Sequence, residues 1–302
     1  MQNFNGWLNV NKPKGISSMG ALIQLKKLLP NKQKIGHAGT LDPMAWGVLP
    51  IALNQTTKLI EFCVGLDKCY KFSIKMGAST DTYDAEGQVT QQCEYIPSKE
   101  ELVDKSRKFI GTISQIPPIY SAIKIDGRRA YSLARSGKDD LEISARFINI
   151  TELNLISYSA ETKIAEFIVK CSKGTYVRSL ACDIMKACGS LGYVIELARL
   201  AVGSFELENT INLAELVKID LFTAQNVIYN SILKPEYVLK QLTYCQEIAI
   251  NEFQLNDIWC GRVIDLDKQD ADSVWLSHEN QLVSIGSIVA GKFMIKKNFN
   301  LN

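Results

Sequence analysis

The residues best suited to chemistry lie in one short stretch, GHAGTLDP at 36–43. Asp42 is the first acidic residue of the chain, and six lysines precede it. Glycines on both sides of His37 and Ala38 permit a close approach of the backbone, and Pro43 favours an extended or turn-like residue before it. A single carboxylate in this basic, glycine-rich setting suits a nucleophile or a general base. The alternative interpretation is an ordinary Asp-Pro turn with His37 as a loop residue.

Residue counts exclude several other mechanisms. His37 and His278 are the two histidines, so a histidine-pair mechanism or a histidine-rich metal cluster is nearly excluded. The sequence contains neither G-x-x-x-x-G-K-[ST] nor G-x-G-x-x-G, and we expect no nucleotide cofactor. The acidic stretch TDTYDAEG at 80–87 lacks the spacing of a calcium loop. We therefore expect an enzyme without a metal or another cofactor.

The distribution of charge is more informative than its total. The formal net charge of the chain is +2, yet residues 1–41 contain six lysines and no acidic residue. A second basic cluster, at 124–138, holds Lys124, Arg128, Arg129, Arg135 and Lys138 against Asp126 alone. Two basic clusters on a nearly neutral protein indicate a surface for a polyanion. The alternative is a set of ordinary solvated lysines and arginines.

The elements that must position these residues alternate without a regular strand–helix rhythm. Residues 70–76 and 165–171 alternate as half-buried strands do. Helices are expected after Ser17 or Ser18, with Met19, Leu22, Ile23 and Leu29 on one face; after the Ser98–Glu101 capping box; and over 176–188. After about residue 235, short apolar runs separated by glycines predict a small β domain. We expect an α+β fold with domains at 1–235 and 236–302.

Composition sets the remaining limits. A chain of 302 residues suits about two domains. With 46% hydrophobic and 22% charged residues it is typical of a soluble globular protein. The sequence shows no run long enough to span a membrane and no secretion signal, so we expect a cytoplasmic protein. Its eight scattered cysteines then predict reduced thiols rather than disulfides or a zinc site.

Seven blocks of this sequence occur in the order found in one known family. They are NKPKG at 11–15, GHAGTLDPMAWGVLP at 36–50, TK at 57–58, DKCY at 67–70, TDTYDAEG at 80–87, QIPPIYSAIKIDGRRAYSLARSG at 115–137 and CSKGTYVRSLACDI at 171–184. Together they resemble the bacterial TruB family, the tRNA pseudouridine-55 synthases, over about residues 6–205. The segment at 282–299 resembles, less sharply, the small PUA-like domain of that family.

The resemblance implies a fold, an activity and roles for single residues. The fold would be a central mixed, largely antiparallel sheet flanked by helices, followed by a β-rich PUA-like domain. The activity would be conversion of uridine 55 in the tRNA T loop to pseudouridine, with the base extruded. By the same resemblance Asp42 would be the catalytic aspartate, Arg178 the arginine paired with it, and Tyr70 the ring that stacks on the target base. Tyr70 could equally be core, and Arg178 a surface charge on a helix.

Other positions are carried over by motif or by charge. Tyr176 and Leu197 would line the uridine pocket, although Leu197 also suits an apolar core. His37 would fill space that flipped bases vacate. Expected contacts to the RNA backbone are Lys12, Lys58, Arg128 and Arg129. Trp46 and Ala198 depart from the family pattern, which leaves Arg199 alone where the family tends to have two arginines.

Two rival functions remain open at this stage. One is a tRNA-folding chaperone that binds without catalysis, and the other is a glycosidic enzyme acting on another substrate. The second usually needs two carboxylates, and the motif pairs Asp42 with an arginine instead. The expected partner is the T-stem loop of tRNA, with no membrane and no obligate protein partner, and the protein is expected to be a monomer.

Overall fold

The computed structural model describes residues 4–30, 33–120, 124–125, 128–129 and 143–301. The elements of its larger part, in chain order, are β1 (Gly6–Lys12), α1 (Ser18–Leu28), β2 (Ile35–His37), β3 (Trp46–Leu53), η1 (Asn54–Leu59), α2 (Ile60–Gly65), β4 (Lys68–Met76), β5 (Ala78–Thr80), β6 (Val89–Gln92), α3 (Lys99–Ser106), η2 (Arg107–Phe109), β7 (Gly111–Gln115), β8 (Lys124–Ile125), β9 (Arg128–Arg129), β10 (Arg146–Ser159), β11 (Ile164–Cys171), α5 (Val177–Ala187), β12 (Gly192–Val202), β13 (Phe205–Glu206), η3 (Leu207–Asn209), β14 (Ile211–Asn212), α6 (Leu213–Leu216) and α7 (Leu221–Asn230).

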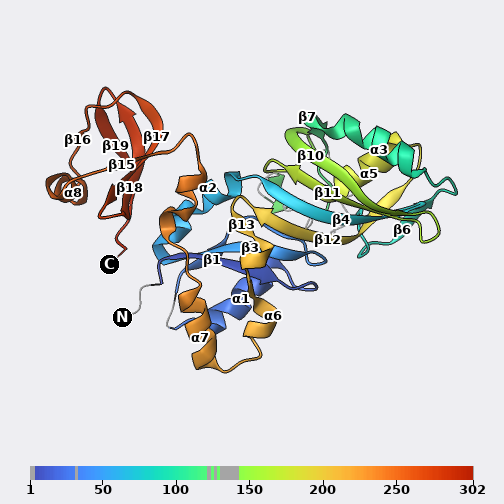
Figure 1. The fold of residues 1–302 in the computed structure, drawn as a ribbon, viewed down its shortest axis with the longest axis horizontal. Coiled ribbons are helices and arrows are strands. Elements are labelled where there is room, and N and C mark those ends of the chain that lie inside the picture. Colours follow the sequence, from blue (N-terminus) through green and yellow to red (C-terminus); the bar gives the residue numbers. More distant parts are fainter. Residues whose placement is uncertain (1–3, 31–32, 121–123, 126–127, 130–142, 302) are drawn as a thin grey trace.

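A large mixed sheet organises this part of the chain. Its strands follow the order β14-β1-β3-β12-β4-β11-β10-β7, with β13 and β2 paired to β12 and β3. The pairs β1–β14 and β3–β12 are parallel, and the other pairs of the sheet are antiparallel. Helices α3 and α5 lie at one end of the sheet, and α1, α6 and α7 gather at the other (Figure 1). The expected α+β class with a largely antiparallel central sheet is confirmed.

Two neighbouring strands show why the alternating pattern was a reliable signal. On β4, Phe72, Ile74 and Met76 are at most 1% exposed. On β11, which pairs with it, Ala165, Phe167, Val169 and Cys171 are equally buried. The Phe72 and Phe167 rings stack with centroids 5.5 Å apart. Helix α5 covers this face, so the strands stay apolar on one side only.

Helix α1 is present, and of the four apolar residues expected on its buried face Leu22 and Leu29 are buried but the other two are not. The Ser17 hydroxyl accepts a hydrogen bond from the Gly20 amide, which caps the helix as predicted. Ala21 and Leu25 are buried, whereas Met19 and Ile23 are 56% and 53% exposed. The expectation that Met19 and Ile23 share the buried face is therefore wrong. The spacing of apolar residues is compatible with two neighbouring faces of the helix. The face that carries the small Ala21 is the one that packs against the core.

The C-terminal part forms a second, smaller sheet. Its elements are η4 (Pro235–Tyr237), η5 (Leu239–Gln241), β15 (Gln246–Ala249), α8 (Glu252–Trp259), β16 (Ile264–Asp265), β17 (Ala271–His278), β18 (Gln281–Val289) and β19 (Lys292–Asn298). The five strands follow the order β15-β17-β18-β19-β16 (Figure 1). The predicted small β-rich unit is confirmed, while α8 and β17 were not foreseen. The division at 235/236 stays a prediction.

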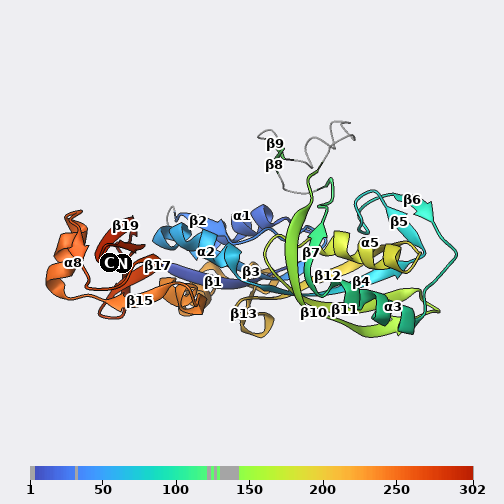
Figure 2. The ribbon, with the colours of Figure 1, turned by 90° about the horizontal axis from the view of Figure 1, so that it is seen from above.

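The two sheets share apolar contacts. Trp275, Leu282 and Phe299 of the C-terminal unit belong to the same buried cluster as Trp7 and Leu59. Figure 2 shows the C-terminal unit beside the end of the larger sheet where β1 and β2 lie. Within the described ranges, no helix is long and apolar enough to cross a membrane.

Candidate active site

A cavity of about 520 Å³ opens between the large sheet and the loop that carries Asp42. Its wall comes from the Gly39–Asp42 loop, from β4, from the turn before α5 and from β12. Of the residues predicted for the site, the cavity brings together five: Asp42, Tyr70, Tyr176, Arg178 and Leu197. The fold thus gathers positions that are far apart in sequence, as the family resemblance implies.

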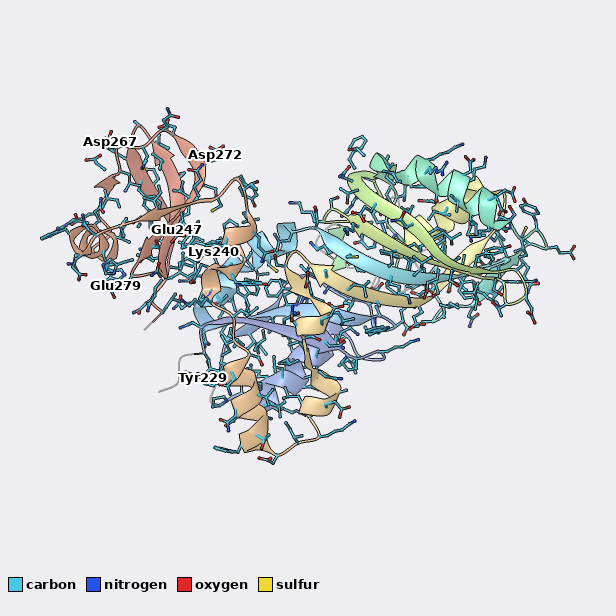
Figure 3. All side chains as sticks on the ribbon, in the orientation of Figure 1. Tyr229, Lys240, Glu247, Asp267, Asp272 and Glu279 are labelled. Carbon is cyan, nitrogen blue, oxygen red and sulfur yellow. The ribbon has the colours of Figure 1, made fainter. Side chains whose placement is uncertain are left out.

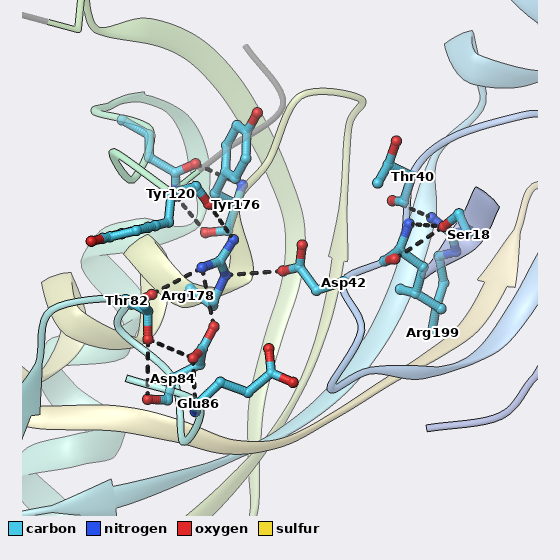
Figure 4. Close-up of polar contacts among 12 residues, drawn as sticks. Ser18, Thr40, Asp42, Thr82, Asp84, Glu86, Tyr120, Tyr176, Arg178 and Arg199 are labelled. Carbon is cyan, nitrogen blue, oxygen red and sulfur yellow. Dashed lines mark hydrogen bonds and ion pairs between the residues drawn. The ribbon is translucent and has the colours of Figure 1, made fainter. Parts of the chain in front are cut away.

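An ion-pair network lies in the wall of this cavity. Arg178 Nε lies 2.9 Å from Asp42 Oδ2, and 34% of the Asp42 side chain is exposed against 6% for Arg178. On its other edge, Arg178 Nη1 lies 3.1 Å from Asp84 Oδ2, and 5% of the Asp84 side chain is exposed. One buried guanidinium therefore holds two carboxylates, of which Asp42 alone lines the cavity (Figure 4). The alternative of Arg178 as a surface charge is wrong.

The rest of the Arg178 guanidinium is also engaged. Nη1 donates to the carbonyl of Thr82 at 2.9 Å, and Nη2 donates to the carbonyl of Tyr120 at 2.9 Å. Asp84 is fixed in turn, since its Oδ1 accepts from the Thr82 hydroxyl and from the Glu86 amide. Because each of these bonds restricts the guanidinium, Arg178 offers Asp42 a partner of fixed direction.

The Asp42 loop is held from two sides. The Ser18 hydroxyl accepts from the Leu41 amide at 2.8 Å and donates to the Leu41 carbonyl at 3.0 Å. Arg199, which is 1% exposed, donates to the carbonyls of Gly39 and Thr40 at 3.1 and 3.3 Å (Figure 4). The carboxylate therefore projects from a loop whose backbone is fixed immediately before it, at Gly39, Thr40 and Leu41.

Three of these supporting residues were missed or misjudged from the sequence. Asp84 stood in the acidic stretch weighed as a metal site, and its partner lies 94 positions away. The sequence marks Arg199 only as a single arginine where the family tends to have two, whereas the structure buries it and bonds it to backbone carbonyls. Ser18 was considered only as a helix cap. A carboxylate inside a family motif was the one available signal for Asp84.

Tyr70 and Leu197 form part of the apolar wall. Tyr70 shares the face of β4 that carries Phe72, and Leu197 of β12 pairs with Phe72 across the strands. Burial raises the pKa of Tyr70, and the positive charge of Arg199 opposes that shift. The ring is therefore an uncharged surface at neutral pH, suited to stacking on a base.

Tyr176 precedes α5 and borders the same cavity. Its amide donates to Gln115 Oε1 at 2.8 Å, and its carbonyl accepts from Gln115 Nε2 at 3.1 Å. Gln115 is 1% exposed at the end of β7, so this pair of bonds fixes the start of α5. His37, by contrast, lies on β2 opposite Ile51 and outside the cavity wall, and its role stays a prediction.

Lys12 does not have the surface position expected of a phosphate contact. Its side chain is 0% exposed, and Nζ donates to the carbonyls of Pro13 and Ile16 at 2.9 and 2.7 Å, with Pro43 at 3.5 Å. Burial lowers the pKa of Lys12 to about 8, a shift that Asp42 opposes. The expectation of a phosphate contact is wrong, because the Lys12 ammonium already donates its hydrogen bonds to backbone carbonyls on either side of the Asp42 loop.

The structure does not test the other expected RNA contacts, which are Lys58, Arg128 and Arg129. Lys58 Nζ donates to the carbonyl of Asn298 at 2.7 Å and lies 5.3 Å from the centroid of the Phe299 ring, so it joins the two sheets. Burial lowers the pKa of Lys58, and Lys34 and Lys297 add to that shift. Arg128 and Arg129 form β9, but their side chains lie outside the described part of the chain. These three contacts stay predictions.

Comparison with solved structures supports the fold. A crystal structure of a Cbf5-Nop10-Gar1 complex matches with a TM-score of 0.74 at 23% identity, covering 99% of this chain and 86% of that chain. An H/ACA RNP bound to a substrate RNA containing 2'-deoxyuridine matches with a TM-score of 0.74 at 21% identity, covering 99% and 86%. At these identities the likeness concerns the fold alone.

Residues 26–177 match the model described as TruB family pseudouridylate synthase (N terminal domain). The fold and the site thus define a pseudouridylate synthase, and the chain belongs to the TruB family. Curated relatives named tRNA pseudouridine synthase B include those of Rickettsia bellii (strain OSU 85-389), 41% identical over 300 residues with 98% of each chain covered, and of Ehrlichia ruminantium (strain Gardel), 36% identical over 300 residues with 98% of this chain and 99% of the relative covered. The resemblance in the sequence motifs is confirmed.

Proposed function

We propose that this protein converts uridine 55 in the T loop of tRNA to pseudouridine, with Asp42 as the catalytic carboxylate. One observation carries the proposal: Asp42 is held 2.9 Å from a buried Arg178 at the wall of a cavity that Tyr70 also lines. The names of the curated relatives support tRNA as the substrate.

The reaction needs what this cavity offers. The bond from uracil N1 to ribose C1′ breaks, the base turns, and a bond from C5 to C1′ forms. C5 loses a proton and N1 gains one, so the product is an isomer and no oxidant or energy source is required. Since the base must leave the RNA stack to reach Asp42, an aromatic wall is useful. Stacking on Tyr70 contributes about 1–3 kcal/mol toward holding the extruded base.

The rival functions receive less support from the geometry. A chaperone that only binds RNA has no need of a partly exposed carboxylate beside a fully engaged arginine. A glycosidase would use two carboxylates at the reacting bond, and among the described residues Asp42 is the one carboxylate in the cavity wall. We further propose that the protein acts as a monomer without a protein partner, and the cytoplasmic location stays a prediction.

The test uses an unmodified tRNA transcript and the same transcript with cytidine at position 55. After incubation with the purified protein, carbodiimide labelling and primer extension locate any pseudouridine. We expect one new pseudouridine, at position 55, and none in the cytidine control. Tight binding without pseudouridine in either RNA would instead favour the chaperone, and pseudouridine elsewhere would reject the assigned position.

A further inference from the structure

Positive charge dominates the wall of the catalytic cavity. The described residues of the wall include five cationic side chains, those of Lys68, Arg146, Lys173, Arg178 and Arg199. Asp42 is the one acidic residue among them. The question is which of these cations already have partners within the protein, because only the others are available to a ligand.

Three of the five are occupied by the protein itself. Arg178 holds Asp42 and Asp84, as described above. Arg199 donates to three backbone carbonyls, of which Val48 at 2.7 Å is the nearest. Lys68 is 7% exposed and donates to the carbonyls of Val64 and Leu66, near the end of α2. Their charge supports the fold and the Asp42 loop.

Arg146 is different. It stands at the start of β10, and its Nε is buried with no hydrogen-bond partner in the described part of the chain. No carboxylate of the described residues forms an ion pair with it. A buried guanidinium nitrogen without an acceptor is costly, and such a group in a cavity wall indicates a missing anionic partner.

The surroundings of Arg146 hold the guanidinium in place and leave room beside it. Its Cζ lies 5.9 Å from the centroid of the Tyr176 ring, a cation–π arrangement at the cavity wall. Gly174 has φ +84°, and a Cβ there would lie 4.0 Å from Arg146 Nη1. A Cβ at that distance would be in ordinary van der Waals contact, so the turn lies against the guanidinium, and the positive φ is what favours glycine there. Lys173 on the same turn is exposed and lines the cavity.

We propose that Arg146 and Lys173 form a phosphate subsite at the end of the cavity next to Tyr176, for a phosphodiester group adjacent to the extruded uridine. This rests on the proposed function, because an extruded nucleotide brings its flanking phosphates with it. The planar guanidinium can donate two parallel hydrogen bonds to one phosphate, and Lys173 adds a second charge. Asp42 and Tyr70 then act on the base while Arg146 fixes the backbone.

The test neutralises one phosphate at a time in a synthetic T-arm hairpin. Each linkage flanking the target uridine is replaced by an uncharged methylphosphonate on a 2′-deoxynucleotide, and the 2′-deoxy phosphodiester serves as its reference. Binding of the full-length protein is measured for the wild type, Arg146→Gln and Lys173→Ala. Arg107→Gln is the matched control, since Arg107 is an exposed arginine on η2 outside the cavity wall.

We expect one linkage at which the methylphosphonate weakens wild-type binding by at least about tenfold. Arg146→Gln should weaken binding of the unmodified hairpin by a similar factor. Placing the methylphosphonate at that linkage should then weaken its binding no further, whereas it should weaken binding of Arg107→Gln as much as that of the wild type. Lys173→Ala should show a smaller loss of the same kind, and it changes only an exposed side chain. The subsite would be overturned if the loss caused by the methylphosphonate added in full to the loss caused by Arg146→Gln and to that caused by Lys173→Ala. It would also be overturned if both variants bound the unmodified hairpin as tightly as the wild type does. Pseudouridine formation in the unmodified hairpin by the wild type checks the proposed function separately.

Discussion

Two arginine–aspartate pairs of equal length lie in different parts of the molecule. Arg178 Nη1 and Asp84 Oδ2 are 3.1 Å apart beside the cavity that Asp42 lines, with 6% and 5% of their side chains exposed. Arg262 Nη1 and Asp257 Oδ1 are also 3.1 Å apart, in the C-terminal unit, with 71% and 39% exposed. The same contact is thus made in two different dielectric surroundings, and the surroundings decide what each pair can do.

The wider regions differ in the same way. Residues 236–302 contain nine acidic and six basic residues, and acidic side chains such as Glu247, Asp267, Asp272 and Glu279 lie exposed on the C-terminal unit (Figure 3). Near the cavity, Lys12, Asp84, Arg178 and Arg199 are all at most 5% exposed. Around the Asp42 cavity, buried charges hold one another in fixed orientations, because water cannot screen them. In the C-terminal unit most of it remains on the surface, although Glu236 is 3% exposed.

The largest expected effect is at the carboxylate that lines the cavity. Asp42→Asn keeps the shape of the side chain and removes its charge, so turnover should fall by roughly 10³-fold or more. Binding of tRNA should change little, because the backbone contacts remain. Single-turnover assays and filter binding measure the two separately. Near-normal turnover by protein free of contaminating synthase would show that the network around Asp42 has no catalytic purpose.

The paired substitutions Asp84→Asn and Asp257→Asn test the comparison directly. Asp84→Asn leaves part of a buried charge uncompensated, which costs up to about 3–5 kcal/mol of unfolding free energy. A small displacement of Arg178 from Asp42 should also lower turnover by up to about 100-fold. Asp257→Asn should cost no more than about 1 kcal/mol and leave turnover unchanged.

Denaturant unfolding and single-turnover rates, measured on both variants under one set of conditions, decide between these outcomes. Equal losses in the two variants would mean that burial does not distinguish the two pairs.

Lys12 gives a prediction with a pH dependence. Its pKa is about 8 in the folded protein against 10.5 ordinarily, so between these values the unfolded chain binds more protons than the folded one. Stability then rises with pH across this window, and below pH 8 the burial cost is fully present. Lys12→Met lacks this titrating group. The free energy of unfolding of the wild type should therefore rise by on the order of 1–3 kcal/mol relative to that of the variant between pH 8 and 10.5.

Urea unfolding of both proteins at several pH values measures that difference. Lys68 has the same lowered pKa in both proteins, so its contribution cancels in the comparison. A constant difference across the window would show that Lys12 is accessible to solvent.

The smallest effects are expected at exposed lysines. With Lys12 buried, Lys26 and Lys27 on the last turn of α1 are the better candidates for phosphate contacts. Replacing either by Ala should flatten the salt dependence of tRNA binding by roughly one unit for each lost contact, with turnover at saturation unchanged. Titrations at several salt concentrations test this, with Lys99→Ala on α3 as the control. Slopes equal to that of the wild type would mean that α1 is solvated surface.

The sequence predicted the structure best where a residue pattern was compatible with a single arrangement. Alternation on 70–76 and 165–171 allows a single buried face, and the motifs placed Asp42 and Arg178 together. Prediction from the sequence failed where several arrangements were compatible with the same residues. The lysines before Asp42 are alike in sequence, and only the carbonyls around Nζ distinguish Lys12 from Lys26. Asp84 could not be paired in advance, because contact with Arg178 depends on how β5, α5 and the intervening loop pack.

The close approach of Gly47 to Arg199 restricts how this site can vary. Gly47 has φ +110°, and a Cβ there would lie 2.3 Å from the Arg199 carbonyl oxygen. Its neighbour Trp46 is partly exposed, and its indole nitrogen donates to Glu196 at 3.4 Å. In a saturation-mutagenesis library, position 47 should therefore return almost exclusively glycine among active clones, while position 46 accepts many residues. Adjacent positions of one strand thus differ sharply in the side chains they can accept, because the first is partly open to solvent and the second lies against backbone.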